Sequence, residues 1–360
     1  MMREERIKKI FSLTKKDVDA IIVKNSNLNP SFFYLTGLPR EFYEGAIAVA
    51  WKDGRVDVIV SRIEQTEDSE LIFHTVKDSE ETKKLLKQLA KDANCIGFDG
   101  IHTTVSSYRV MRRIFQKKRF YDVGRDILRA RLIKSKDEIE KIKRACRIAS
   151  IVADEIVDIL KESITEREVA DEIVYRLRRY GARREAFETI VAFGRNSAIP
   201  HYLHGEKRLK KDEIVLVDFG AVVDGYISDI SRTFVYGRAS ERQKKMYEVV
   251  LKAQKIAIES IKEGMVFESL HKKVQRCIDK TEFRGRFIHS TGHTIGIEVH
   301  DGFSLAEGTK EKFFDGVAFT IEPGIYLKSI GGIRIEDDFV FLNGRVKRLT
   351  HAPVFLETSS

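Results

Sequence analysis

Two aspartates, Asp218 and Asp229, stand at the ends of the segment DFGAVVDGYISD, whose middle residues are typical of a tight turn. The flanking stretches EIVLVDFG and YISDISRTFVY alternate between apolar and polar residues, so we expect a β-hairpin. A turn centred between Val223 and Asp224 places the two aspartates directly opposite each other. A turn centred on Asp224–Gly225 shifts the register by two residues, and both carboxylates still share a face. Opposed like charges destabilise a sheet unless a cation neutralises them. The pair is either a cation site or two solvated carboxylates beside a surface turn.

Further candidate ligands follow in three segments. The Gly-punctuated stretch FIHSTGHTIGIEVH contains three of the nine histidines: His289, His293 and His300. Glu322 lies at the end of an apolar strand pattern, directly before a Pro-Gly turn. In GIRIEDDFVF, the alternation places Arg334, Glu336 and Asp338 on one face of a strand. A glutamate in an apolar strand is costly to bury unless it is paired or binds a metal.

The order and context of five of these residues resemble a known family. Asp218, Asp229, His293, Glu322 and Glu336 lie within DFG, GYISDISRT, GHTIGIEVH, TIEPGIY and GIRIED. These motifs resemble those of the pita-bread metallopeptidases, which include aminopeptidase P, prolidase and methionine aminopeptidase. The resemblance covers about residues 125–350, and LRARLIKSKDEIEKIKRA matches the entry to that domain. The preceding α/β segment resembles the N-terminal domain of the creatinase, prolidase and aminopeptidase P branch, which methionine aminopeptidases usually lack.

The resemblance implies a role for each of the five residues. They would hold two divalent cations, Mn²⁺ or Co²⁺ with Zn²⁺ or Fe²⁺ as alternatives, because the donor set is rich in oxygen and contains no thiolate. Asp218 would be bidentate to one metal and His293 would bind the other. Asp229 and Glu336 would bridge both metals. Glu322 would be a ligand that also takes a proton from the attacking water.

Four further residues have implied roles around the metals. His201, in NSAIPHY, matches the histidine that lines the substrate pocket. His300 matches the histidine that contacts the scissile carbonyl. His289 matches a histidine at the proton-transfer edge, and a structural hydrogen bond within its loop is the alternative. Arg334 would either hold a ligand aspartate or reach a substrate carboxylate.

The resemblance implies two closely related activities. Prolidases, which are restricted to Xaa-Pro dipeptides, often carry an arginine four residues after the histidine that matches His300. Here Ser304 stands at that position, in VHDGFSL. We therefore expect an Xaa-Pro aminopeptidase, which hydrolyses the bond between an N-terminal residue and proline, with prolidase as the alternative. A non-catalytic relative used as a binding module is a third hypothesis, and the presence of all five ligand positions argues against it.

The composition and the charge of the chain limit where the protein is expected to be located and what it is expected to bind. The 360 residues are 42% hydrophobic and 33% charged, which is typical of a globular protein, and the apolar runs are too short to span a membrane. The charged start MMREERIKKIF and the three scattered cysteines predict a cytoplasmic protein without a cysteine metal cluster. The net charge of +9 is spread along the chain, so we expect peptide substrates with proline at the second position and no nucleic-acid partner. Relatives of this branch are often homodimers, and we expect the same here.

We expect two domains, at 1–127 and 128–360, whose helices and strands hold these residues in place. In the first domain, strand patterns alternate with helical patterns, which predicts an α/β domain. The strands are expected at 20–23, 45–51, 55–61, 71–76, 95–100 and 119–123, and the helices at about 79–92 and 104–118.

The second domain is expected to be the α+β pita-bread catalytic domain. Its first helix pattern, at 135–162, opens with a capping box of Ser135 and Glu138, and the second opens with Thr165 and Glu168 and closes at Gly181. Two more helices are expected at about 240–262 and 266–280, with β-hairpins between and after the helices.

Overall fold

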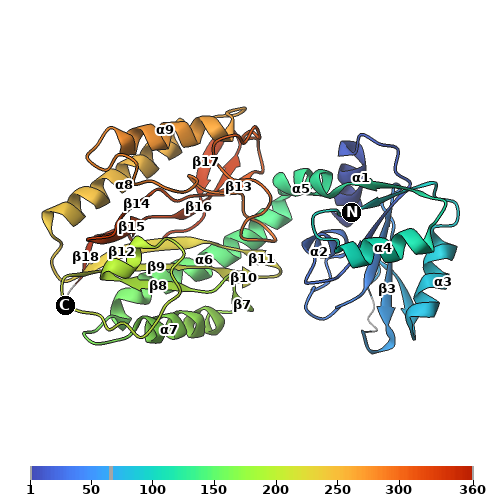
Figure 1. Ribbon diagram of the computed structural model, residues 1–360, viewed down its shortest axis with the longest axis horizontal. Helices are drawn as coiled ribbons and strands as arrows, with labels where there is room; N and C mark the ends of the chain where they lie inside the picture. The colour runs from blue at the N-terminus through green and yellow to red at the C-terminus, as the bar shows by residue number, and fades with distance from the viewer. Residues whose placement is uncertain (1, 65–67, 359–360) are drawn as a thin grey trace. The chain divides into compact units, whose positions relative to one another are not determined.

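The computed structural model describes residues 2–64 and 68–358, and the chain forms two compact units, Met1–Arg131 and Leu132–Ser360 (Figure 1). Helix α5 (Gly124–Leu132) runs through residue 127. The domain boundary expected at 127/128 falls within this helix and stays a prediction.

The first unit is built on one mixed sheet. Among its described residues, six strands lie in the order β4-β3-β2-β1-β5-β6. They are β1 (Ala20–Lys24), β2 (Ile47–Trp51), β3 (Val56–Ser61), β4 (Ile72–Val76), β5 (Cys95–Phe98) and β6 (Arg119–Asp122). Strands β1, β2 and β3 pair antiparallel, and the outer pairs β3–β4, β1–β5 and β5–β6 are parallel. The expected strands are all present.

Helices accompany this sheet, and some of them were not expected. The helices are α1 (Met2–Leu13), α2 (Pro30–Thr36), α3 (Ser79–Leu89) and α4 (Val105–Ile114), with a 3₁₀ turn η1 (Arg62–Glu64). Helices α3 and α4 confirm the predicted helical patterns. Helices α1, α2 and α5 lie where no helix was predicted. The α/β class of this unit is confirmed.

The second unit contains four long helices in its described part, together with a 3₁₀ turn. They are α6 (Lys136–Ile159), α7 (Glu166–Arg179), α8 (Glu241–Ser260), α9 (Phe267–Asp279) and η2 (Gly194–Ala198). Both predicted capping boxes form, Ser135 with Glu138 and Thr165 with Glu168. Of these helices, none combines the length and the hydropathy that crossing a bilayer requires, and the same holds for the other described helices.

The strands of the second unit form several small sheets in its described part. The sheet orders are β11-β10-β7, β18-β12-β9-β8, β13-β16-β17 and β14-β15. The strands are β7 (Arg184–Glu185), β8 (Ile190–Phe193), β9 (Glu213–Phe219), β10 (Ala221–Val223), β11 (Tyr226–Ile227), β12 (Ile230–Tyr236), β13 (Ala318–Ile321), β14 (Gly324–Leu327), β15 (Gly331–Arg334), β16 (Asp337–Leu342), β17 (Arg345–Arg348) and β18 (Glu357–Thr358).

These sheets lie between two pairs of helices. In Figure 1, α8 and α9 cover one side of the strands, and α7 covers the other side with α6 next to it. Apolar residues of α6 and α7, such as Val152 and Ile173, pack with Val217 of β9 in one buried cluster. In a second cluster, Val250 of α8 packs with Phe319 of β13. The two layers of helices therefore bury both faces of the strands that carry the site, and the expected pita-bread fold class is confirmed.

The hairpin that carries the two aspartates has the second of the two registers considered. Asp218 pairs with Ser231, and Val222 pairs with Ile227, so the turn is centred on Asp224–Gly225. Direct opposition of Asp218 and Asp229, the first register, is wrong. Both turn residues have positive φ, 48° at Asp224 and 79° at Gly225, which is the conformation of a type I′ turn.

The segment GIRIEDDFVF does not form one continuous strand. Arg334 ends β15, Asp337 begins β16, and Glu336 lies in the short link between them. The backbone N–H of Glu336 instead donates to the carbonyl of Ser231 in β12. The break in the strand places the carboxylate of Glu336 beside the hairpin.

Candidate metal centre

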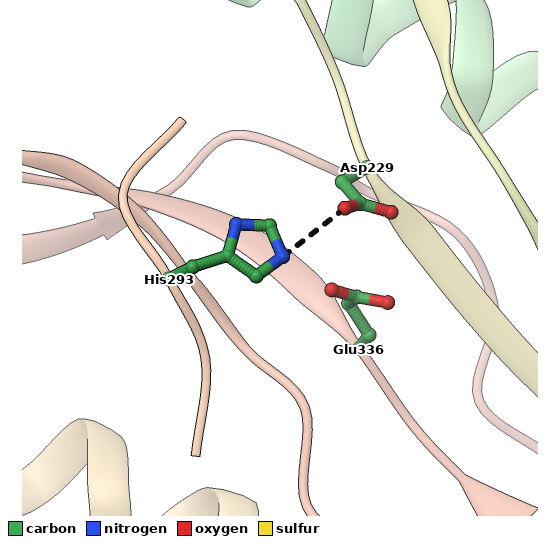
Figure 2. Close-up of side chains that lie close together, drawn as sticks. All are labelled: Asp229, His293 and Glu336. Atoms are coloured by element: carbon green, nitrogen blue, oxygen red, sulfur yellow. Dashed lines mark ion pairs between the residues drawn. The ribbon is translucent and has the colours of Figure 1, made fainter. Parts of the chain in front are cut away.

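Three side chains from three separate segments converge in the second unit. Asp229 lies between β11 and β12, His293 lies in the loop before β13, and Glu336 lies in the link between β15 and β16. One ligand atom from each residue lies within 4.8 Å of the others. Figure 2 shows the three groups pointing toward one another, with His293 Nε2 3.5 Å from Asp229 Oδ2. At this spacing the three groups could hold one cation between them.

The other two predicted ligands lie beside this group. Glu322 directly follows β13, and its Oε1 is 3.4 Å from His293 Nε2. Asp218 lies near the end of β9, and its Oδ2 accepts a hydrogen bond from Arg334 Nη2 at 2.5 Å. All five predicted ligands therefore face the same space, and Asp229, His293 and Glu336 form its most compact part.

All the predicted site residues line one cavity of about 500 Å³. It is lined by Asp218, Asp229, His293, Glu322 and Glu336, and also by His201, His289, His300 and Arg334. A volume of this size lies within the range of small-molecule sites. The four outer residues predicted from the motifs therefore line the same cavity as the five predicted ligands.

The donor atoms of the site fit a divalent cation. Asp218 Oδ1 and Asp229 Oδ1 are buried, and among the described residues they have no hydrogen-bond partner. His293 Nδ1 lies 3.4 Å from the carbonyl oxygen of Thr294, which can only accept, so the proton is on Nδ1. The Nε2 lone pair then points at the carboxylates. Buried acceptors without a proton donor are the arrangement that a metal ion completes.

The electrostatics of the cluster favour the binding of a positive charge. Burial, followed by the charges of Glu336 and Asp218, raises the pKa of Asp229 well above its usual value. Burial, together with the charges of Glu322 and Asp218, does the same to the pKa of Glu336. Burial also raises the pKa of Glu322 to about 8. A nearby divalent cation would favour the charged form of each carboxylate and reverse these shifts.

Arg334 is the cation of the site, and its guanidinium is held from several sides. Its side chain is 3% exposed and donates to Asp218 through Nη2. Nε donates to Ser231 Oγ at 2.8 Å, and Nη1 donates to Tyr326 Oη at 3.0 Å. Ser231 Oγ in turn donates to Glu336 Oε2 at 2.7 Å. Arg334 thereby orients one predicted ligand directly and a second through Ser231. Of the two roles considered for it, the contacts match the first.

Three residues that support the ligands were not predicted as site residues. Ser231 and Tyr326 bind Arg334, and Asp338 Oδ2 accepts the backbone N–H of Asp229 at 2.8 Å. Ser231 and Tyr326 lie inside the motifs SDISRT and EPGIY, and Asp338 was recognised only as sharing a face with Glu336. The spacing of Ser231, two residues after Asp229, was the available signal.

His289 lies in a hydrogen-bonded chain at the edge of the cavity. Its Nδ1 is 2.8 Å from the carbonyl of Ser290, so Nδ1 carries the proton, and Nε2 accepts from Tyr326 Oη at 2.8 Å. Burial, with the charge of Arg334 adding to it, lowers the pKa of His289 to about 3. Nδ1 is also 3.7 Å from Glu322 Oε2. The structural hydrogen bond considered as an alternative is therefore present, and the ring also lies close to Glu322.

His300 packs against a predicted metal ligand. The ring centroids of His293 and His300 are 4.3 Å apart. Burial, with the neighbouring His201 adding to it, lowers the pKa of His300, so its ring is neutral near pH 7. A neutral imidazole can donate one hydrogen bond to a substrate carbonyl.

Comparison with known proteins agrees with this arrangement. Residues 140–342 match the model of metallopeptidase family M24, and residues 6–133 match the creatinase/prolidase N-terminal domain. A Xaa-Pro dipeptidase of Pyrococcus horikoshii is 33% identical over 350 residues, which are 96% of this chain and 97% of the relative.

Solved structures share the whole architecture. The prolidase from Pyrococcus horikoshii superposes with a TM-score of 0.89 at 31% identity, covering 98% of this chain and 99% of that one. An X-Pro aminopeptidase from Thermotoga maritima has the same TM-score of 0.89 at 28% identity, covering 99% of each chain. The fold is thus common to proteins with either name.

Proposed function

The chain belongs to metallopeptidase family M24, in the branch with a creatinase/prolidase N-terminal domain, and on this basis we propose that it is an Xaa-Pro dipeptidase. It is a hydrolase of peptide bonds. The observation that carries the proposal is the convergence of Asp229, His293 and Glu336 in one cavity of small-molecule size.

The proposed ligands of two divalent cations are Asp218, Asp229, His293, Glu322 and Glu336. Their oxygen-rich donor set favours Mn²⁺ or Co²⁺, with Zn²⁺ or Fe²⁺ as alternatives. When bound, such a pair of cations supplies an activated water and polarises the scissile carbonyl. Family membership supports the divalent metals, and the buried, unpartnered oxygens of Asp218 and Asp229 support the positions of two ligands.

The residues of this chain then have distinct proposed tasks. Glu322 takes the proton from the attacking water, because its carboxylate is buried beside His293 and lines the cavity that the substrate enters. His300 donates a hydrogen bond to the oxygen of the scissile carbonyl as charge develops there. His201 contacts the substrate from the cavity wall, and His289 with Tyr326 holds the edge near Glu322.

The aminopeptidase expected from the sequence becomes the second candidate, because the similar Xaa-Pro dipeptidase and prolidase favour the alternative. One observation still favours the aminopeptidase. A dipeptidase must bind the free carboxylate of its substrate. Among the described residues that line the cavity, Arg334 is the one Lys or Arg side chain, and its donors already bind Asp218, Ser231 and Tyr326.

A comparison of substrates separates the two candidates. The kcat/KM is measured for an Xaa-Pro dipeptide, for the same dipeptide amidated at its C-terminus, and for the Xaa-Pro-Yaa tripeptide, with Mn²⁺ or Co²⁺ added. For a dipeptidase, amidation or extension lowers kcat/KM more than about tenfold, which is ~1.4 kcal/mol of transition-state binding. Equal or better cleavage of the tripeptide contradicts the proposal and restores the aminopeptidase. A homodimer and a cytoplasmic location remain predictions.

A further inference from the structure

One segment without regular strands forms a wall of the cavity. Residues 194–205, called here the wall segment, begin with the 3₁₀ turn η2 and continue as an irregular chain to Gly205. Four consecutive residues of the segment line the cavity: Pro200, His201, Tyr202 and Leu203. Leu203 is 67% exposed. A chain with so little secondary structure needs other contacts to keep these side chains in place.

A single carboxylate accepts hydrogen bonds from three residues of the wall segment and from Phe193 directly before it. Glu166 Oε1 accepts the backbone N–H of Phe193 and the side-chain amide of Asn196, both at 2.8 Å. Glu166 Oε2 accepts the hydroxyl of Tyr202 at 3.0 Å and the backbone N–H of Gly205 at 3.1 Å. The residue is 0% exposed. Four donors from one stretch of chain thus converge on one buried charge.

These bonds are not needed to begin the helix that carries Glu166. Helix α7 begins at Glu166, and its start is already completed by the capping box of Thr165 and Glu168. A buried carboxylate is costly unless hydrogen bonds compensate it. The hydrogen bonds that compensate the burial of Glu166 come from the wall segment and from Phe193 directly before it. The charge therefore ties the segment to α7.

The opposite side of the wall segment lies on the strand that leads to the metal centre. Gly332 of β15 donates its N–H to Ser197 Oγ at 2.8 Å, and Arg334 Nη1 donates to the carbonyl of Pro200 at 3.3 Å. A Cβ at Gly332 would lie 2.1 Å from the carbonyl oxygen of Ser197, so this close approach requires glycine. The wall segment is clamped between α7 and β15.

We propose that Glu166 is a positioning residue for the substrate, because it fixes the wall segment and thereby the places of His201 and Leu203 in the cavity. The identity of the substrate rests on the proposed function, whereas the clamp itself does not. Loss of the clamp leaves the metal ligands intact and displaces the wall that the substrate meets.

The test replaces Glu166 by glutamine in the full-length, metal-loaded protein. Glutamine keeps the size of the side chain but turns one acceptor oxygen into an NH₂ donor. Whichever way the amide is turned, the N–H of either Phe193 or Gly205 faces a donor and loses its bond. We expect KM for an Xaa-Pro peptide to rise about tenfold or more, with metal content unchanged and a smaller change in kcat.

Glu168→Gln is the matched control, because it makes the same change of charge two residues away on the same helix. Glutamine at this position still completes a capping box, and we expect wild-type KM. Asn196→Ala provides a second, milder variant. It removes one donor to Glu166 and keeps the carboxylate, so it tests the clamp even where Glu166→Gln reduces folding.

Amide hydrogen–deuterium exchange supplies a readout that does not depend on activity. We expect faster exchange within residues 193–205 in Glu166→Gln and in Asn196→Ala, and unchanged exchange in Glu168→Gln. If exchange is faster in the clamp variants but even the wild-type protein cleaves no Xaa-Pro peptide, the clamp is supported and the proposed substrate is rejected. Unchanged exchange and unchanged KM in both clamp variants overturn the proposal. So does a loss of activity that follows only the fraction of unfolded protein.

Discussion

The carboxylate of Asp338 accepts a hydrogen bond from the backbone N–H of Asp229, across 109 positions of the chain. Asp338 lies in β16, two residues after Glu336, so one side chain connects the segments of two proposed bridging ligands. Its backbone N–H is itself held by Thr350 Oγ1 at 3.0 Å. The two ligands are therefore fixed relative to each other before any substrate binds.

Removal of this connection should weaken metal binding. Asp338→Ala leaves the N–H of Asp229 without its acceptor, and we expect the affinity for Mn²⁺ or Co²⁺ to fall about tenfold or more, as is typical when a supporting partner of a ligand is lost. Calorimetric titration of the metal-free protein measures this. Asp338→Asn retains an acceptor oxygen and should lose less affinity. Equal affinities in the wild type and Asp338→Ala would show that Asp338 does not orient the ligand.

Loss of a proposed bridging ligand should abolish turnover. Asp229→Ala or Glu336→Ala removes a carboxylate that would contact both cations, so we expect no measurable hydrolysis and fewer than two metals per chain by elemental analysis. The stabilisation that excess metal gives to the native state should shrink as well. A variant that keeps near-normal activity and two metals contradicts the dinuclear site.

His300→Ala should lower the rate without loss of metal. The proposed hydrogen bond forms as charge develops on the carbonyl oxygen, and loss of one such donor costs ~3 kcal/mol, or about a hundredfold in kcat. His351→Ala is the matched control, because His351 is exposed and does not line this cavity. A purely structural histidine would instead lower the melting temperature and leave the rate per folded molecule unchanged.

Arg334→Met should destabilise the metal-free protein more than the metal-loaded one. The substitution leaves the buried carboxylate of Asp218 without its partner, and breaking a buried pair in this way costs about 3–5 kcal/mol. Bound metal supplies positive charge beside Asp218 and should recover part of the loss. Urea unfolding with and without Mn²⁺ measures both values.

Arg242→Met serves as the control for this experiment. Its side chain is 57% exposed and its guanidinium is 4.0 Å from Glu282, so we expect a change of less than about 1 kcal/mol. If metal makes no difference to the loss caused by Arg334→Met, the arginine does not compensate the charge of Asp218.

Ser304→Arg should increase the preference for a free C-terminal carboxylate. Ser304 forms a β-bridge with His293, so position 304 is next to a proposed ligand, and its side chain is exposed. An arginine there adds a cation that can bind a carboxylate through two hydrogen bonds. We expect the ratio of kcat/KM for a dipeptide over its amide to rise. Ser304→Gln, which has length but no charge, should leave the ratio unchanged.

From the sequence, the residues that line the cavity were easier to predict than the register of the hairpin. The family motifs pointed to five residues as ligands, and the fold brings these five residues to one cavity. Each motif is short, so it could be recognised without knowing which residues lie near it in the fold. The hairpin register was harder, since VVDG permits two turn centres. Positive φ at both Asp224 and Gly225 decides for the second, and Asp-Gly is the commoner signal for that turn.

Helix α2 shows a signal that was present and overlooked. Asn29 caps the helix, Pro30 stands at its first position, and Gly37 ends it with φ of 71°. Its residues PSFFYLT are all buried, so they show no amphipathic pattern. Periodicity alone cannot identify a short helix that is buried on every side.

Contacts between residues that are far apart in the chain could not be predicted from the sequence. Glu166 reads as an ordinary acidic residue in the first turn of a helix, a common position for glutamate. Only the folded chain brings Phe193, Asn196 and Tyr202 to its carboxylate. The same holds for Asp338, whose partner Asp229 lies 109 positions earlier in the chain.

The wide separation of bonded partners around the metal centre has a kinetic consequence. Ser231 and Glu336 are joined across 105 positions, and Arg334 and Asp218 across 116. Contacts of such separation close large loops, and the entropy lost in closing them makes their formation slow. The helices, by contrast, can form from neighbouring residues. In refolding, the ability to take up metal should therefore lag behind the recovery of helical signal, and cation binding would report the final stage of folding.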